Sequence, residues 1–109
     1  MTYIVKFTGL ARRDLEEIVA YIAVHADPLT AASVLEAIEK RCTDLSEFPD
    51  RGNVPKEFAA INNRRYRELH YKPYRIVYRV KDNEVLIQCV VDGRRNMADF
   101  LRQRLSRID

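Results

Sequence analysis

Arginines in the second half of the chain carry most of the chemistry that this sequence could perform. Arg75 and Arg79 belong to an alternating run, and alternate residues of a β-strand point to the same face of a sheet. We therefore expect the two guanidinium groups together, with Val77 between them. A guanidinium fork matches the geometry of carboxylates and phosphates, so this pattern predicts a surface that holds an acidic group.

Glu68 and His70 are the candidates for proton transfer. They stand two apart on one predicted strand, share a face, and could act as base and acid. Metal-free RNA cleavage activates a 2′-hydroxyl, protonates a leaving 5′-oxygen and stabilises charge on phosphate, which Arg67, Arg75 and Arg79 could do. Alternation places Glu68 and His70 on the face opposite Arg67, and a Glu-x-His pair on a strand is more often solvated than catalytic.

A second group of candidates follows the last predicted strand. Arg94 and Arg95 come directly after a turn at Asp92-Gly93, and loops at strand ends often carry function. They either contact a target, or one of them forms a salt bridge to the helices of the first half. The amphipathic helix that follows could dock on the sheet or grip a target. Its own candidate contact residues are Asn96, Met97, Arg102 and Arg104.

Length and composition limit the class of protein. The chain has 109 residues, of which 47% are hydrophobic, so we expect one domain over residues 1–109 with a buried core. It shows no apolar run of transmembrane length and no signal peptide, which favours the cytoplasm and no membrane partner. Its two cysteines and two histidines lack the spacing of metal ligands, so we expect neither metal nor cofactor.

Charge is divided along the chain. Residues 9–48 carry a net charge of −4 and residues 49–109 a net charge of +6, within a total of +3. The basic half should attract an acidic partner, either nucleic acid or an acidic protein segment. The alternative is that these are solvated surface charges without a specific ligand.

Periodicity predicts the order β-α-α-β-β-β-α. The expected elements are a strand over 3–8, helices over 9–25 and 28–48, a helical turn over 57–61, strands over 65–71, 74–80 and 84–91, and a helix from Asn96 to about Arg107. The short link at Asp27-Pro28 makes the first two helices an antiparallel hairpin, which should cover one face of an antiparallel sheet of about four strands. The other face, carrying Arg67, Arg75 or Arg79, should stay free for partners or for the last helix. The predicted class is α+β.

Apolar phase also predicts the core. Tyr74 and Tyr78 fall in the apolar phase of their strand and should face the helical hairpin. Phe48 is expected to end the inner stripe of the second helix. Cys42 and Cys89 fall in apolar stretches and are expected to be small buried hydrophobic residues.

Several segments occur in an order that matches a known family. They are Phe7-Thr8 with Ala11…Asp14-Leu15…Ile18…Tyr21-Ile22, then Pro49-Asp50-Arg51-Gly52-Asn53, Tyr66-Arg67-Glu68-Leu69, Pro73-Tyr74-Arg75-Ile76-Val77-Tyr78 and Asp92-Gly93-Arg94-Arg95. On these residues the chain resembles the RelE/ParE superfamily of toxins from bacterial type II toxin–antitoxin pairs. The resemblance implies a compact toxin silenced by a cognate ParD- or RelB-like antitoxin in a hetero-oligomer. The antitoxin would also bind operator DNA.

The superfamily has two working modes. RelE-like members cleave mRNA on the ribosome and place a Tyr or His near the C-terminus, whereas ParE-like members poison DNA gyrase and need no catalytic residue. The tyrosine position of RelE falls near Phe100 here, and a phenyl ring cannot move a proton. The ending looks more like that of ParE members, although these often have His where Asp92 stands.

The resemblance therefore implies a gyrase-binding toxin. Its target contacts would be Arg94, Arg95, Asn96, Met97, Arg102 and Arg104, and its antitoxin contacts Arg67, Arg75 and Arg79. One alternative is a ribosome-dependent mRNA endonuclease, in which Glu68 or His70 and the arginines replace the missing tyrosine. Another is a protein of toxin fold that only binds its antitoxin and co-represses the operon.

Overall fold

A four-stranded sheet forms the centre of the protein, in the order β1-β4-β3-β2. The computed structural model describes residues 2–105. The elements are β1 (Ile4–Phe7), α1 (Gly9–His25), α2 (Pro28–Asp44), α3 (Lys56–Ala59), β2 (Tyr66–Tyr71), β3 (Tyr74–Lys81), β4 (Glu84–Asp92) and α4 (Met97–Leu105). The predicted α+β class and element order are confirmed. The predicted end of the last helix, near Arg107, lies outside the described residues.

Strands β2, β3 and β4 form an antiparallel meander, and β1 adds to β4 in parallel. β4 is therefore a central strand, as its almost continuous apolar run predicts. The sequence did not fix the direction of β1, because a strand joined through a long helical connection can pair either way.

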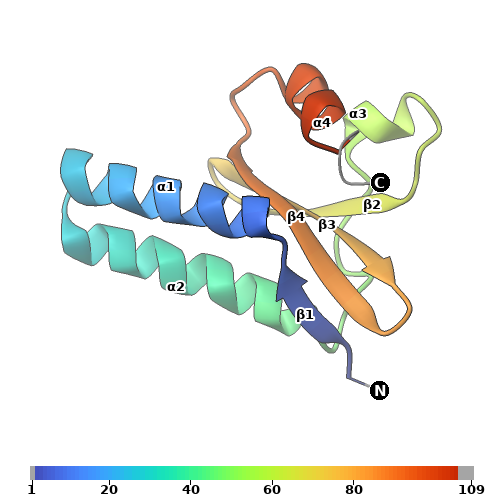
Figure 1. The fold of residues 1–109 in the computed structure, drawn as a ribbon, viewed down its shortest axis with the longest axis horizontal. Helices are drawn as coiled ribbons and strands as arrows, with labels where there is room; N and C mark the ends of the chain where they lie inside the picture. Colours follow the sequence, from blue (N-terminus) through green and yellow to red (C-terminus); the bar gives the residue numbers. More distant parts are fainter. Residues whose placement is uncertain (1, 106–109) are drawn as a thin grey trace.

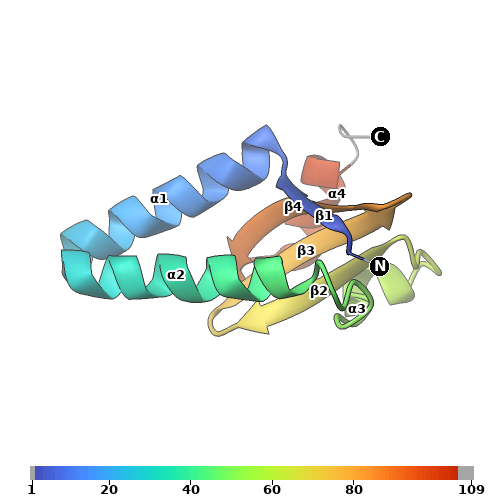
Figure 2. The same cartoon turned by 90° about the horizontal axis from the view of Figure 1, so that it is seen from below.

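Helices cover both faces of the sheet. The α1–α2 hairpin lies on one face and extends beyond the strands, while α4 lies on the other face (Figures 1 and 2). The first core, under the hairpin, contains Leu15, Ile38, Ile76, Tyr78 and Ile87. The second core, under α4, contains Val77, Cys89, Val91, Leu101 and Leu105. The sheet face that carries Arg75 is thus covered by the last helix, one of the two occupants expected.

The helix starts follow the capping residues in the sequence. The Ala11 amide donates to Thr8 Oγ1 (3.1 Å), and the Thr30 amide donates to Asp27 Oδ1 (2.7 Å). At α4 the Asp99 amide donates to the side chain of Asn96 (3.2 Å). Each cap satisfies an amide that has no partner inside its helix.

The expectation for Phe48 is wrong. Helix α2 ends at Asp44, and Phe48 is 53% exposed, with the guanidinium of Arg51 over its ring at 4.7 Å. Because Phe48 lies beyond the end of α2, helical spacing no longer directs its side chain to the inner face of the helix. Cys42 and Cys89 are buried as expected, and burial raises the pKa of both thiols to about 12. Within residues 2–105, no helix has the length and apolarity to cross a membrane.

Candidate functional site

The strand register decides which candidate side chains meet. Arg75 pairs with His70 and Val77 with Glu68, so these two candidates share the face of Arg75 and Arg79. Arg67 instead pairs with Tyr78 and lies on the hairpin face. The expectation that Arg67 shares a face with Arg75 is wrong, whereas the expectation that Glu68 and His70 lie opposite Arg67 is confirmed. Each strand alternates as predicted, but only the register of the β2–β3 hairpin fixes which faces coincide.

Arg75 is the centre of a partly buried ion network, which we call the charge cluster (Glu57, Glu68, His70 and Arg75). Its Nε donates to Glu68 Oε1 at 2.5 Å, and its two terminal nitrogens donate to the Glu57 carboxylate at 2.8 and 3.0 Å. The Arg75 side chain is only 12% exposed. The arginine does hold acidic groups, as the pattern predicted, but they belong to its own chain.

Electrostatics in the charge cluster favour the charged forms. Hydrogen bonds from Arg75 lower the pKa of Glu57, and the bond to Glu57 raises the pKa of Arg75. The Glu68 carboxylate also accepts from Asn53 Nδ2 at 3.2 Å and lies 3.3 Å from His70 Nε2. The cluster therefore joins α3, β2 and β3 through one guanidinium.

Arg67 secures the loop before α3. Its guanidinium donates to the carbonyl of Gly52 at 2.6 Å, and the Tyr78 hydroxyl donates to the carbonyl of Pro49 at 2.8 Å. The Gly52 amide donates back to that hydroxyl at 3.0 Å. A Cβ at position 52 would lie 2.5 Å from the carbonyl oxygen of Glu68, so only glycine fits there. The motif Pro49-Asp50-Arg51-Gly52-Asn53 is thus explained by the hydrogen bonds that anchor this loop to β2 and β3.

Ion pairs hold most of the arginines in the C-terminal segment, which we define as residues 92–105. Among the described residues, Arg94 pairs with Asp92 at 2.6 Å, Arg102 with Asp99 at 3.0 Å, and Arg104 with Asp14 at 2.7 Å. Hydrogen bonds from Arg94 lower the pKa of Asp92 to about 2. Within the part of the chain that the structure describes, neither Arg94 nor Arg95 bridges to the helical hairpin, whereas Arg104 does.

The Asp14–Arg104 pair lies at an irregularity of the sheet. Val77 pairs with Cys89 but Tyr78 pairs with Ile87, so β4 carries one extra residue between them. Asp14 on α1 accepts from the Val90 amide at 3.1 Å next to this bulge, and it binds both terminal nitrogens of Arg104. One partly buried carboxylate therefore ties α1, β4 and α4 together.

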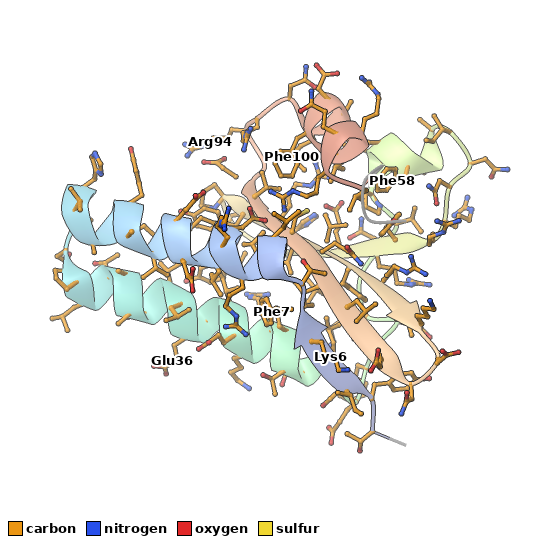
Figure 3. The ribbon with its side chains drawn as sticks, viewed as in Figure 1. Lys6, Phe7, Glu36, Phe58, Arg94 and Phe100 are labelled. Carbon is orange, nitrogen blue, oxygen red and sulfur yellow. The ribbon has the colours of Figure 1, made fainter. Side chains whose placement is uncertain are left out.

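Phe100 lies between two arginines. The guanidinium carbons of Arg95 and Arg104 lie 4.7 and 4.9 Å from its ring centroid. Figure 3 shows Phe100 on the side of α4 that faces α1, whereas Phe58 belongs to α3. A shallow groove runs there between the start of α1 and α4. It is lined by Leu10, Arg95, Phe100, Gln103 and Arg104.

Sequence reasoning missed three residues that organise these sites. Glu57 and Asp14 hold the key arginines, and Phe100 supports Arg95. Asp14 and Arg104 are 90 residues apart in sequence, so no local pattern links them. The other predicted C-terminal candidates, Asn96 and Met97, act as the cap and as a buried core residue.

Comparisons with known proteins agree on the fold. Residues 5–97 match the family model described as the ParE toxin of type II toxin–antitoxin system, parDE. The chromosomal ParDE system of P. aeruginosa contains a chain of similar structure, with a TM-score of 0.70 and 22% identity over 84% of this chain and 96% of that one. A chain of the RelBE2 toxin–antitoxin complex of Mycobacterium tuberculosis is also similar. Its TM-score is 0.60 and its sequence identity is 26%, over 84% of this chain and 99% of that one.

A mutant of the E. coli toxin RelE in the free state is also similar, with a TM-score of 0.63 and 18% identity over the whole of both chains. Among curated proteins, none matches the chain. The P. aeruginosa and E. coli likenesses are below 25% identity and show the fold alone.

Proposed function

The chain belongs to the ParE toxin family of type II toxin–antitoxin systems, and from this premise we propose that it stops bacterial growth by binding and poisoning DNA gyrase. It would act in the cytoplasm as one toxin domain, without a cofactor. A cognate ParD-like antitoxin would neutralise it.

The engagement of Arg75 by two carboxylates of its own chain is the observation that carries this proposal. A nuclease needs arginine donors directed at the substrate phosphate. Here Nε and both terminal nitrogens of Arg75 donate to Glu57 and Glu68. Two carboxylates at this point would also repel a phosphodiester. This arrangement supports a toxin that binds its target rather than one that cleaves RNA.

Phe100 also supports a toxin that binds its target rather than one that cleaves RNA. The resemblance places it near the position where RelE-like toxins carry a tyrosine, and its ring has no group that could move a proton. Its contacts with Arg95 and Arg104 give it a different use, as a platform for cations.

An antitoxin partner is supported by the similar structures, which come from the ParDE system and the RelBE2 complex. We propose a hetero-oligomer that reaches operator DNA through the antitoxin. Of the three arginines expected to contact it, Arg75 is too enclosed to do so. Arg67, with a side chain 37% exposed, and Arg79 remain the proposed contacts.

A second candidate function is ribosome-dependent mRNA cleavage. One observation favours it, because His70 and Glu68 lie on the arginine face with Nε2 and Oε2 3.3 Å apart. His70 is 54% exposed, so a substrate could reach it.

The two candidates separate in one experiment. Wild type and His70→Ala are expressed from an inducible promoter, and new DNA and new protein are pulse-labelled. We expect DNA synthesis to fall first in both, and co-expressed antitoxin to prevent the loss. Early loss of protein synthesis that His70→Ala abolishes would overturn the proposal in favour of mRNA cleavage. Absence of any growth effect would leave a protein that only binds its antitoxin.

A further inference from the structure

Arg95 differs from the other arginines of the C-terminal segment. Within the described part of the chain, Arg94, Arg102 and Arg104 are each paired with a carboxylate. Arg95 is exposed; its backbone amide donates to the carbonyl of Asp92, and its guanidinium lies over the ring of Phe100 at 4.7 Å. A stack on a ring face restrains a guanidinium without using its N–H groups. Arg95 is therefore the cation of this segment whose donors point to no carboxylate of the described chain.

Buried contacts hold this arrangement in place. Asp14 fixes Arg104, which lies 4.9 Å from the centroid of the Phe100 ring, and that ring supports Arg95. The α4 helix that presents Phe100 is anchored in the second core by Leu101. Such a restrained side chain loses little rotamer freedom on binding, so more of the interaction energy becomes affinity.

The groove beside Arg95 combines charge with apolar surface. Leu10, 41% exposed, and Phe100 supply apolar contacts, and Gln103 supplies a neutral polar group. These neighbours fit a carboxylate that projects from a segment with an apolar side chain next to it.

Charge balance distinguishes a protein partner from nucleic acid. Three of the four described arginines in this segment are neutralised by Asp92, Asp99 and Asp14, which leaves a single uncompensated cation. Binding to nucleic acid needs several phosphate contacts from free cations. A single carboxylate on a protein partner needs only one free cation, which Arg95 supplies.

From these contacts we infer that Arg95, stacked on Phe100, anchors an acidic segment of the toxin's target protein in the groove between α1 and α4. This inference rests on the proposed function, because it places the target contact of the toxin at one residue. The antitoxin is expected to bind elsewhere.

The test compares charge reversals in the full-length toxin, released from its antitoxin complex. Arg95→Glu is measured with Phe100→Leu, which removes the ring without a charge change, and with Arg64→Glu as matched control. Arg64 is an exposed arginine of the loop after α3. Growth inhibition, affinity for purified gyrase, affinity for the antitoxin and affinity for a DNA duplex are recorded for each.

We expect Arg95→Glu to lose growth inhibition and to bind gyrase at least about tenfold more weakly, because one charge pair becomes repulsive. Phe100→Leu should show a smaller loss, and Arg64→Glu and antitoxin affinity should change less than about twofold. Full growth inhibition by a folded Arg95→Glu protein overturns the inference, as does an equal loss in Arg64→Glu. A selective loss of antitoxin or DNA affinity overturns it too.

Gyrase binding by the wild-type toxin distinguishes a failure of the proposed function from a failure of the inference about Arg95. If wild type does not bind gyrase, the gyrase assignment falls while the growth assay still decides about Arg95. If wild type binds gyrase and Arg95→Glu binds equally well, only the inference about Arg95 falls.

Discussion

Arg75 and Arg95 are both arginines near strand ends in the basic half of the chain, but their surroundings are opposite. Arg75 is enclosed, and the carboxylates of Glu57 and Glu68 take its donors. Arg95 is exposed and rests on the ring of Phe100. An arginine paired inside the chain stabilises the fold and is lost to partners, whereas a stacked arginine contributes little to the fold and stays available.

This contrast changes how a basic surface should be interpreted. The net charge of residues 49–109 suggests many contacts with an acidic partner. Four arginines of this half, however, are already paired within the chain, with Glu57 and Glu68, Asp92, Asp99 and Asp14. The number of arginines therefore overstates the number of cations that can bind a partner.

Replacing Arg75 should have the largest effect on stability. Arg75→Met leaves Glu57 and Glu68 enclosed without their counter-ion, which should cost about 3–5 kcal/mol of unfolding free energy. Urea denaturation measures the loss. Arg102→Met, which breaks only an exposed pair, is the control and should cost about 0–1 kcal/mol. A loss for Arg75→Met as small as that of the control would contradict the structural role.

Asp14→Ala tests the connection between α1, β4 and α4. It removes the acceptor of the Val90 amide and the counter-ion of Arg104, for an expected loss of about 2–3 kcal/mol. Glu16→Ala, an exposed change on the same helix, should cost less than about 0.5 kcal/mol. Hydrogen exchange should show faster opening of α4 in Asp14→Ala. Unchanged protection there would mean that apolar packing alone holds the helix.

Gly93→Ala tests how closely the turn covers Arg75. A Cβ there would lie 2.9 Å from Cδ and 3.1 Å from Cγ of Arg75, a side chain fixed by two carboxylates. We expect a loss of about 1–3 kcal/mol in urea denaturation. Gly9→Ala is the matched control, because its Cβ would meet no atom within 4 Å at the start of α1. Equal stabilities of the two variants would show that Arg75 can move aside.

The charge cluster should also make stability depend on pH. Arg75 lowers the folded-state pKa of Glu57 below its usual value of 4.5. The stabilisation from Glu57 is therefore complete above that usual value and is lost as the pH falls through the lowered folded value. Urea midpoints between neutral pH and about pH 3 should fall more steeply for wild type than for Glu57→Gln. Parallel curves would exclude Glu57 as a source of acid sensitivity.

Arg95→Ala should have the smallest effect on stability. Removing an exposed cation over a ring should cost less than about 1 kcal/mol, while growth inhibition is lost. Urea denaturation and a growth assay on the same variant check both parts. A stability loss near that of Arg75→Met would remove the contrast between the two arginines.

Several features of the protein followed from the sequence because they depend on local rules. Alternation placed Arg75, Val77 and Arg79 on one face, and the caps at Thr8, Asp27 and Asn96 fixed where helices begin. The continuous apolar run marked β4 as central. These predictions needed only neighbouring residues, since side-chain direction and helix capping depend on a few positions.

Local rules of this kind could not predict how the strands pair. The register of β2 against β3 put Glu68 and His70 with Arg75, and it put Arg67 on the other face. Alternation within each strand is compatible with either result. A shift of one residue exchanges the faces, and only the packed cores select between them.

The sequence by itself determined the family, the elements and the division of charge, because these are written in composition, spacing and ordered motifs. Only the tertiary structure decided which arginines are available. Arg75 met Glu57 of α3, and Arg104 met Asp14 across 90 residues of sequence. Ion pairs form between groups that packing brings within a few ångströms, and distance along the chain does not set that distance in space.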